Sequence, residues 1–381
     1  MNKHFDVIII GAGIVGLGCA LAAVNRGKKV AIIERNAKAV GASIRNFGFV
    51  TVTGQRAGAH YNRAKRSRDI WAEIAPNAGI DVLHKGLVLP AYREEARDVV
   101  AAFLKTDMGA DCRLLTKTEA QAQIANLKLS GDEAILYSPH ELRVESMTAI
   151  PKLAHWLHEA KGVDFFWKTA ALGIIDNRVK TSRGNFYGNT IIVCPGDDFS
   201  SLYPERIAPH ALSICTLQML RVAPNGAANL SNNNTCRFNA ALMSDHSLAR
   251  YEGFSALPQA AALGARLDRD YPLKRQLGIH LIAVQSADGS LVIGDSHIYG
   301  NAPETFAKTA IDDLMMECLD EIIDLPKREI ITHWIGTYAA SKTKTVLVDS
   351  PQDHVRLVMV TGGTGASTAF ALGEEVMDDL F

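Results

Sequence analysis

Short runs of apolar residues and longer segments of helical spacing alternate at the start of the chain. Phe5 to Ile10 (FDVIII) and Lys29 to Ile33 (KVAII) are rich in β-branched residues, as expected of strands buried on both faces. Between them, Ile14 to Arg26 is rich in Ala, Leu and Val, and Gly27 follows as a helix-ending glycine. The pattern predicts a β–α–β unit with parallel strands.

Both kinds of element recur along the rest of the chain, and we find no internal repeat and no low-complexity tract. Apolar spacing predicts helices at 59–75, 94–105, 118–124, 146–160 and 306–323, and a last helix after residue 365. Strands are predicted at 86–92, near Phe165 and Val179, and at 190–194, 217–222, 279–285 and 357–360, with a polar loop at 225–234. The change of pattern near Leu212 indicates a second, strand-rich domain.

Composition narrows the function classes. With 381 residues the chain has room for two or three domains, and 40 Lys and Arg against 41 Asp and Glu leave a net charge of −1. Such a balance argues against nucleic acid or an anionic membrane surface as a partner held by bulk electrostatics. The basic residues of 59–75 (Arg63, Lys65, Arg66, Arg68) are interpreted as a solvated helix face rather than a binding patch.

The cysteines and the apolar segments indicate a cytoplasmic protein. Six scattered cysteines form no CxxC pair and no metal-binding spacing, so we expect free, mostly buried thiols, a reducing compartment and no metal. Glycines interrupt the apolar N-terminus, which argues against a signal peptide. No uninterrupted apolar run reaches the roughly 18 residues of a membrane span.

A glycine motif provides the first chemical signal. Residues 11–16 (GAGIVG) match GxGxxG between a predicted strand and a predicted helix, and Glu34 ends the next strand 18 residues beyond Gly16. The glycines allow a tight turn and a close approach of the pyrophosphate, while the helix N-terminus favours its negative charge. Glu34 is placed to accept hydrogen bonds from both ribose hydroxyls, which disfavours a 2′-phosphorylated cofactor. The motif predicts a dinucleotide site and leaves NAD and FAD open.

Two further segments favour FAD. Residues 41–48 (GASIRNFG) follow the second predicted strand directly. Residues 361–367 (TGGTGAS) join a strand to the last helix, and such a turn would direct a second helix N-terminus towards a ligand that bears negative charge, as reduced flavin does.

With these motifs the chain resembles the FAD-dependent D-amino-acid oxidase superfamily over essentially its whole length, with a pattern similar to glycine oxidase and monomeric sarcosine oxidase. The segments SIRNFGFVTVTGQ, DGSLVIGDSH, WIGTYA and VTGGTGASTAFALGEE more narrowly resemble amine-oxidising flavoproteins associated with 2-aminoethylphosphonate degradation. The resemblance implies an α/β fold: a Rossmann-like FAD-binding domain of glutathione-reductase type with a mainly antiparallel substrate domain. It assigns 1–84, 140–211 and 332–381 to the FAD-binding domain, and 85–139 and 212–331 to the substrate domain.

The resemblance also implies which residues hold the cofactor. They are Gly11, Ala12, Gly13, Ile14, Val15, Gly16, Glu34, Arg35, Ser43, Asn46, Phe47, Gly48, Ala171, Gly196, Gly362, Gly363, Gly365, Ala366 and Ser367. The covalent cysteine tether of sarcosine oxidases has no counterpart, because no cysteine follows Cys318. We therefore expect non-covalent FAD.

The sequence departs from its amino-acid-oxidising relatives at Tyr338. Those relatives carry an Arg shortly after Trp-x-Gly, where it clamps the substrate carboxylate. Here the segment reads WIGTYA, and Tyr338 stands where that Arg would. A phenol supplies one neutral donor, so the usual clamp is lost unless an Arg from another segment replaces it.

The remaining candidates for chemistry are few, since flavin oxidation of an amine depends on orientation more than on a dedicated acid–base pair. Beside Tyr338 we single out His297, Arg45 and Gln55 as residues that orient the substrate or take a proton. A structural role for His297 is equally open. Lys342 and Lys344 are interpreted as part of an exposed turn rather than as charges that steer an anion towards the site. Tyr251 is a further candidate site residue, but no motif supports it.

We therefore expect oxidation of the C–N bond of a small anionic amine, an aminophosphonate such as 2-aminoethylphosphonate or its N-methyl derivative. The expected products are phosphonoacetaldehyde and an amine or ammonia, with oxygen reduced to hydrogen peroxide. A glycine- or sarcosine-type amino-acid oxidase is the alternative, and a non-catalytic flavin protein that serves as a sensor or electron carrier is a second one. The sequence does not set the oligomeric state.

Overall fold

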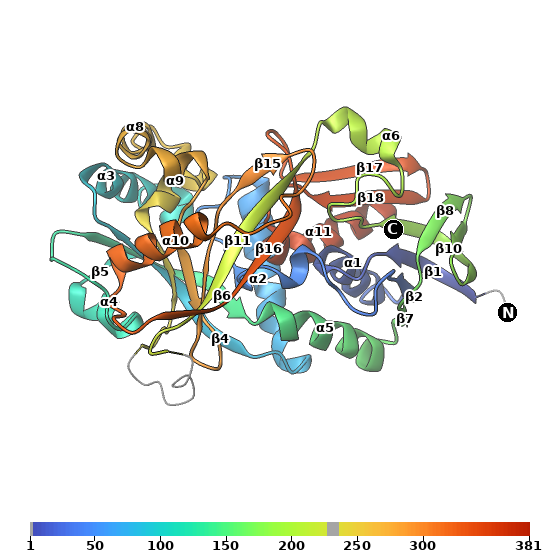
Figure 1. Cartoon of the computed structure of the whole chain (residues 1–381). Helices are drawn as coiled ribbons and strands as arrows, with labels where there is room; N and C mark the ends of the chain where they lie inside the picture. Colours follow the sequence, from blue (N-terminus) through green and yellow to red (C-terminus); the bar gives the residue numbers. More distant parts are fainter. Residues whose placement is uncertain (1–2, 227–235) are drawn as a thin grey trace.

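The structure, a computed structural model, describes residues 3–226 and 236–381. Two β-sheets lie side by side in the described chain, with helices packed on both (Figure 1). Most of the predicted loop at 225–234 lies outside the described residues.

The first sheet contains the predicted β–α–β unit. Its strands are β1 (Lys3–Ile10), β2 (Val30–Ile33), β7 (Asp164–Phe166), β8 (Ala171–Ile175), β9 (Arg178–Thr181), β10 (Gly184–Val193), β17 (Val346–Gln352) and β18 (Val355–Val360). The main path runs β17-β18-β10-β1-β2-β7, and β18, β10, β1, β2 and β7 are parallel. The carboxyl ends of these parallel strands therefore meet at one edge of the sheet.

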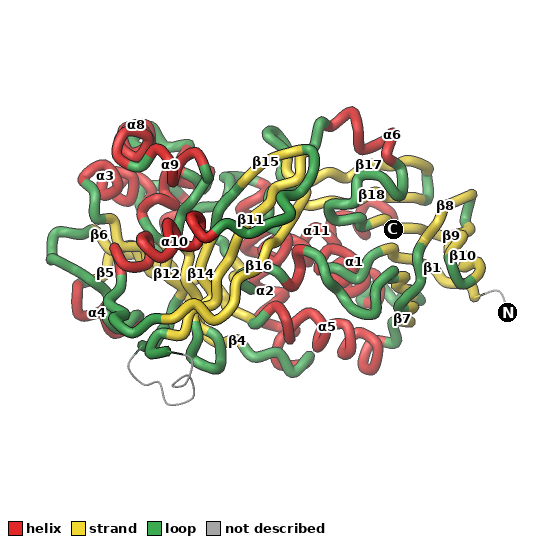
Figure 2. Tube along the Cα trace, in the orientation of Figure 1, coloured by secondary structure: helices red, strands yellow, loops and turns green. Residues whose placement is uncertain are grey.

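The second sheet is mainly antiparallel, as predicted. Its strands are β3 (Phe49–Val50), β4 (Val82–Ala91), β5 (Arg113–Leu115), β6 (Ala134–Val144), β11 (Ser213–Ala223), β12 (Ala241–Met243), β13 (Ile282–Gln285), β14 (Leu291–Gly294), β15 (Ile298–Gly300) and β16 (Glu329–Ala340). The one parallel pair among them is β4 with β12. Figure 2 shows these strands bundled beside the helices of the first sheet.

The helices are α1 (Ile14–Val24), α2 (Ala59–Asn77), α3 (Glu94–Phe103), α4 (Lys117–Gln123), α5 (Ser146–Lys161), α6 (Pro204–Ile207), α7 (Glu252–Ser255), α8 (Ala260–Asp270), α9 (Pro272–Gln276), α10 (Thr309–Ile322) and α11 (Gly365–Leu380). Helix α11 packs against both α1 and α2, so the last helix of the chain is fixed beside the first.

Each sheet is covered on both faces, and alternate strand residues enter different cores. In β1, Val7 and Ile9 pack with α1, α5 and α11, whereas Phe5 and Ile8 enter a separate core on the other face. In β4, Leu87 packs with α3 and α8, whereas Val88 packs with α10. Burying each such side chain stabilises the fold by roughly 1.5–3 kcal/mol. These packed cores fix the position of the two sheets relative to the helices that cover them.

Several element bounds differ from the sequence predictions. The predicted strand at 279–285 begins only at residue 282, because the backbone of His280 bonds to Asp295 and the N–H of Leu281 donates to the Ser244 hydroxyl. The predicted helix at 306–323 begins at Thr309, and Phe306 is exposed to solvent. The long strands β6, β16 and β17 were not predicted, because their apolar residues do not alternate cleanly. The proposed domain bounds stay a prediction.

Other sequence interpretations can also be compared with the structure. Arg63 and Arg66 of α2 form ion pairs with Glu375 and Glu374 of α11, both 2.7 Å long, so this basic face joins two helices. All six cysteines lie in the described residues, and none forms a disulfide. Among the described helices, none has the length and apolarity that a membrane crossing requires.

Candidate active site

A cavity of about 840 Å³ lies where the parallel strands of the first sheet end and the second sheet begins. Residues directly after β1, β2, β10 and β18 line it, together with residues of β11, β13 and β16. Ligands of open α/β sheets bind at this edge, outside the carboxyl ends of the strands. The volume is near the upper end for small-molecule sites, as expected for an elongated dinucleotide with a small substrate.

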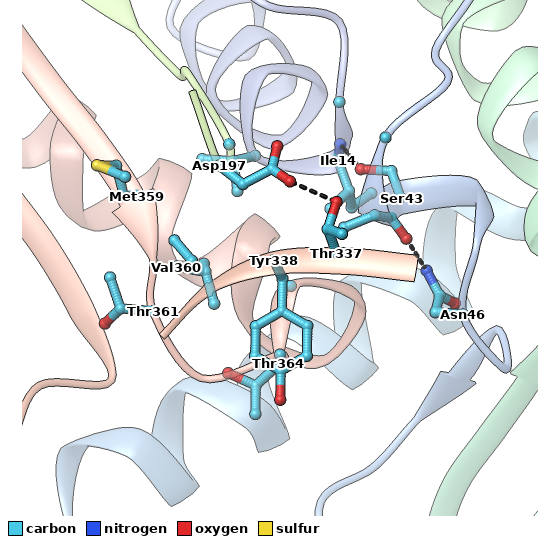
Figure 3. Close-up of a pocket in the computed structure, with 18 of the residues that line it drawn as sticks. Ile14, Ser43, Asn46, Asp197, Thr337, Tyr338, Met359, Val360, Thr361 and Thr364 are labelled. Atoms are coloured by element: carbon cyan, nitrogen blue, oxygen red, sulfur yellow. Dashed lines mark hydrogen bonds between the residues drawn. The ribbon is translucent and has the colours of Figure 1, made fainter. Parts of the chain in front are cut away.

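One end of the cavity is formed by the glycine turn and the N-terminus of α1. The N–H of Ile14 donates to the Ser43 hydroxyl at 2.9 Å, which fixes the 41–48 segment against the helix start (Figure 3). Gly13 caps the helix with no side-chain hydrogen bond. A Cβ at Gly16 would lie 2.0 Å from the carbonyl oxygen of Gly11, so a larger residue would push helix and turn apart. This helix start can accept a pyrophosphate.

Glu34 is held rigidly at the end of β2. Its Oε2 accepts from the N–H of Ala12 at 3.0 Å, and its Oε1 accepts from the backbone and side chain of Asn36 at 2.8 and 3.0 Å. The carboxylate still lines the cavity, where its remaining lone pairs can accept from ribose hydroxyls. Neighbouring Arg35 also lines the cavity, but its guanidinium pairs with Asp198 at 2.7 Å.

The 41–48 segment has a more structural role than its motif suggested. Asn46 lines the cavity, yet its side chain donates to the Ala42 carbonyl at 2.7 Å and accepts from Ser146 at 2.7 Å. Phe47 also lines the cavity. Gly48 does not; its carbonyl accepts from the N–H of Val144 at 2.9 Å, which joins the segment to the end of β6.

A second wall, beside the start of α1, is the turn between β18 and α11, where a Cβ at Gly365 would lie 3.3 Å from the Ile14 side chain. Gly362, Gly363, Gly365, Ala366 and Ser367 all line the cavity at the start of α11. Part of the turn has structural partners: the Ala366 carbonyl accepts from the Trp71 indole at 2.8 Å, and the Ser367 hydroxyl accepts from the N–H of Thr51 at 2.8 Å. These two buried anchors hold the start of α11 against the cavity.

The remaining predicted cofactor residues extend the cavity along the first sheet. Gly11, Gly13, Val15, Ala171 and Gly196 line it. Ala12 is buried beneath the turn and reaches the site through its bond to Glu34. Beside Gly196, Asp197 accepts from the Thr337 hydroxyl at 2.5 Å, which ties the end of β10 to β16 (Figure 3).

Tyr338 lies between the α11 turn and the second sheet. A Cβ at Gly363 would lie 2.9 Å from the Tyr338 ring, so glycine is needed where the ring covers the turn. The ring centroid is 6.5 Å from that of His297. Burial raises the pKa of Tyr338 well above its ordinary value, so the phenol is a neutral donor.

The other predicted catalytic residues also line the cavity but differ in character. His297 is buried. Gln55 is buried, and its side-chain amide donates to the Thr51 carbonyl at 3.3 Å. Arg45 is exposed, with its guanidinium 3.5 Å from the Ile335 carbonyl. Lys344 lies in an exposed turn, as expected, and it also lines the cavity.

The structure adds an arginine that no motif indicated. Arg250 follows the short helix at 245–249, lines the cavity and donates from Nη2 to the Tyr299 hydroxyl at 3.1 Å. Burial alone would lower the pKa of Arg250, but Tyr299, Tyr338 and Asp295 raise it, so the guanidinium stays charged. An Arg from another segment thus faces the site from which the Trp-x-Gly arginine is missing.

Three buried titratable residues complete this end of the cavity: His280, Asp295 and His297. Burial raises the pKa of Asp295 to about 7, although the charge of Arg250 opposes the rise. Burial, followed by the charge of Arg250, holds the pKa of His280 and of His297 well below the ordinary value. The sequence did not indicate that His280 joins this group, because it lies 15 residues before Asp295. Only Asp295 and His297 are close in sequence, within the Asp-Ser-His triplet at 295–297.

These residues fit FAD. The cavity joins the N-termini of α1 and α11, whose N-cap residues make no side-chain cap bond, with a fixed carboxylate at the end of β2 and a group of buried polar residues beyond the second turn. Gly11, Gly13, Gly16 and Glu34 would hold the ADP half, and the 362–367 turn would face the flavin. The space around Arg250 and the Asp295 group would remain for a substrate.

The fold is shared with several solved structures. Glycine oxidase from Bacillus cereus ATCC 14579 superposes with a TM-score of 0.76 at 18% identity, covering 99% of this chain and 94% of that one. L-proline dehydrogenase from P. horikoshii gives 0.78 at 17% identity, covering 99% and 93%. FAD-bound L-α-glycerophosphate oxidase from Mycoplasma pneumoniae gives 0.71 at 16% identity, covering 99% and 95%.

Sequence comparison gives short matches to glycerol-3-phosphate dehydrogenases and one nearly complete match to a family model. Rat (Rattus norvegicus) mitochondrial glycerol-3-phosphate dehydrogenase is 55% identical over 45 residues, which are 12% of this chain and span 6% of that protein. The model of the family described as "FAD dependent oxidoreductase" (DAO) matches residues 6–378. The chain therefore belongs to the DAO family of FAD-dependent oxidoreductases.

Proposed function

We propose that the protein oxidises the C–N bond of a small amine that carries an anionic group. Our first candidate is an aminophosphonate, N-methyl-2-aminoethylphosphonate or 2-aminoethylphosphonate. Bound FAD would supply the acceptor for two electrons, with oxygen as the final acceptor and hydrogen peroxide as the product. The resulting imine takes up water and releases phosphonoacetaldehyde with methylamine or ammonia.

The observation that carries this proposal is Arg250 at the enclosed end of the cavity. Its guanidinium is fixed by the Tyr299 hydroxyl at 3.1 Å, and Tyr338 lies at the same end. A charged donor beside two phenols offers several separate hydrogen bonds to one anion. Each charge-assisted bond contributes roughly 1.5–3 kcal/mol, so two or three of them select strongly against an uncharged amine.

The donor arrangement supports a tetrahedral anion. A single planar fork facing the substrate, as in the amino-acid-oxidising relatives, suits the two oxygens of a carboxylate. Here that position holds Tyr338, and the arginine comes from a different segment. Three phosphonate oxygens can each take a donor from a different direction. The motifs that resemble aminophosphonate-oxidising flavoproteins support the same choice.

Arg250 also favours a second candidate, a glycine- or sarcosine-type amino acid. A guanidinium can bind a carboxylate through two parallel hydrogen bonds, whichever segment it comes from. One of the solved structures that share the fold is a glycine oxidase. The two candidates differ in the geometry of the anion and agree that the anion is negatively charged.

A comparison of specificity separates them. We would measure kcat/KM for N-methyl-2-aminoethylphosphonate, sarcosine and glycine under identical conditions, with N-methylpropylamine as the uncharged control. The proposal predicts the highest value for the phosphonate and the lowest for the uncharged amine. If either amino acid exceeds the phosphonate by about tenfold, the carboxylate function holds and the phosphonate function does not.

A further inference from the structure

The group formed by His280, Asp295 and His297, here called the Asp295 cluster, lies at the same end of the cavity as Arg250. All three side chains are buried, with exposed fractions of 2%, 5% and 7%. The Nε2 atoms of His280 and His297 lie 3.3 and 3.5 Å from the two carboxylate oxygens of Asp295. Oδ1 of Asp295 has no hydrogen-bond partner among the described residues. The residues assigned above to FAD do not include this cluster.

The hydrogen bonds of the two imidazoles show where protons can sit. Nδ1 of His297 lies 3.0 Å from the carbonyl oxygen of Gly278, which can only accept, so this nitrogen carries a hydrogen. In a neutral ring, Nε2 of His297 is then a lone pair that faces Asp295. Nδ1 of His280 meets the Ser247 hydroxyl at 3.1 Å, which can donate, so Nε2 of His280 can carry a hydrogen on the side of Asp295, although it is not aligned for a hydrogen bond to Oδ1.

One proton is therefore missing from the contact between Asp295 and His297. An ionised carboxylate that faces an imidazole lone pair is a repulsive contact. A proton between Oδ2 and Nε2 turns it into a hydrogen bond. The cluster is built to gain one proton at that position, and its burial makes an unpaired charge there costly.

The surroundings keep the cluster available for this proton. Arg250 is the cation that faces it. The Tyr251 ring meets the His280 ring edge-on at 5.6 Å between centroids, and burial raises the pKa of Tyr251. Burial likewise raises the pKa of Tyr338, raises that of Cys215 to about 11 and lowers that of His246 to about 3, so these neighbours are neutral at pH 7. Tyr299, which is hydrogen-bonded to Arg250, is the last of the titratable groups around the cluster.

We propose that the Asp295 cluster accepts the proton of the substrate's ammonium group. This inference rests on the proposed function. An amine must be neutral before flavin can oxidise it, whereas a small anionic amine arrives as a zwitterion. As its anionic group binds Arg250, the N–H bond of the ammonium breaks and an O–H bond forms at Asp295, shared with Nε2 of His297. No electrons leave the amine in this step.

Two electrostatic effects drive the transfer. The enclosed cavity disfavours the charged form of the amine and so lowers its pKa. Neutralising Arg250 with the substrate anion removes the cation that stabilises ionised Asp295, which raises the affinity of the carboxylate for a proton. The anionic group of the substrate thereby binds Arg250, and the proton of its ammonium group moves to the Asp295 cluster.

A divalent cation is the competing occupant of the cluster. One potential ligand atom from each of the three residues lies within 4.8 Å of the others. The positive charge of Arg250 next to them opposes a second cation, whereas it favours an ionised carboxylate that awaits a proton. Metal analysis of the purified protein distinguishes the two: one bound metal ion per chain that chelators remove would overturn the proposal.

The main test is the second-order rate constant of flavin reduction at low substrate concentration, measured anaerobically against pH in the FAD-loaded protein. In the wild type, this constant should rise with pH through a step near pH 7, where Asp295 of the substrate-free protein ionises. Asp295→Asn should lose this step and about 100-fold or more of the rate at pH 7. Asp312→Asn is the matched control, because Asp312 is also buried and accepts from His333 at 3.0 Å, away from the cavity. It should keep the step.

A second readout does not depend on turnover. Ethanesulfonate is a tetrahedral anion that carries no amine and does not titrate near neutral pH. When it binds Arg250 at about pH 8, the wild type and Asp312→Asn should take up close to one proton, seen by calorimetry in two buffers of different ionisation enthalpy. Asp295→Asn should take up none.

The outcomes separate the two proposals. If no amine reduces the flavin, the proposed function fails and the proton acceptor fails with it. If amines reduce the flavin but Asp295→Asn keeps the step near pH 7, the function stands and the Asp295 cluster is not the proton acceptor.

Discussion

Arg250 donates from Nη2 to the hydroxyl of Tyr299 at 3.1 Å, and this bond joins the segment before α7 to strand β15. The two residues are 49 positions apart in the sequence. Tyr299 is half-exposed, with 53% of its surface accessible, so the pair lies where the enclosed end of the cavity meets solvent. An anion that enters the cavity meets a guanidinium whose direction is already fixed.

This relationship predicts the effect of Arg250→Met. Removing the charged donor should raise KM for the anionic amine by roughly ten- to a hundredfold, corresponding to one lost charge-assisted hydrogen bond. The kcat/KM of an uncharged amine should change little. Arg269→Met, on the exposed face of α8, is the control for loss of a positive charge and should leave both values unchanged. Equal losses for charged and uncharged amines would mean that Arg250 supports the fold rather than the anion.

Glu34→Arg should weaken FAD retention. The substitution removes the acceptors for the ribose hydroxyls and also the bonds to Ala12 and Asn36 that hold the turn. We expect the FAD dissociation constant, measured by fluorescence titration of cofactor-free protein, to rise at least about tenfold. Glu159→Arg on the solvent face of α5 provides the same charge change and should have no effect. Unchanged affinity in Glu34→Arg would show that Glu34 does not contact the ribose.

The purified protein should be yellow and should release FAD when it is denatured. No cysteine lies among the residues that line the cavity except Cys194, at the end of β10. Cys318, the last cysteine in the sequence, is buried on α10 outside the cavity. Cofactor that remains with the precipitated chain, while FAD added to stripped protein is recovered in the supernatant, would prove a covalent link.

The ionisation of Asp295 should appear in the stability of the protein. Burial raises its pKa from 3.8 to about 7. Between these values the unfolded chain has lost the proton and the folded chain has not, so the stability contributed by Asp295 is full below pH 4 and is lost as pH rises through 7. Asparagine does not ionise, so its contribution to stability does not change over this pH range.

Asp295→Asn should therefore gain stability relative to wild type as pH rises. The difference in unfolding free energy should shift towards the variant by on the order of 3–4 kcal/mol between about pH 4 and pH 8. Denaturant titrations of both holoproteins at the two pH values measure it. A difference that stays constant with pH would mean that Asp295 ionises as freely in the folded protein as in the unfolded chain.

The cofactor end of the molecule could be predicted from the sequence because its signals are local. A strand, a glycine turn and a helix follow each other within residues 5–26, and Glu34 ends the next strand. The chemistry of each position depends on neighbours a few residues away. The second glycine turn at 361–367 was found in the same way.

The substrate end could not be predicted, because tertiary packing assembles it. Arg250, His280, Asp295, Tyr299 and Tyr338 come from separate segments of the second sheet and its connections. Cross-strand pairing places Tyr338 opposite Cys215, and no sequence spacing encodes that register. The departure at Tyr338 did indicate that another arginine could be required, but its position became visible only in the fold.

The most direct test of the central claim is anaerobic mixing of the FAD-loaded protein with two amines that share the N-methylaminoethyl part, N-methyl-2-aminoethylphosphonate and N-methylpropylamine. Loss of the yellow flavin absorbance reports oxidation of the amine before any electron acceptor is involved. We predict rapid bleaching by the phosphonate at concentrations at least about a hundredfold below those that the uncharged amine needs. Equal bleaching by the two amines, or none by either together with none by sarcosine and glycine, would contradict the account.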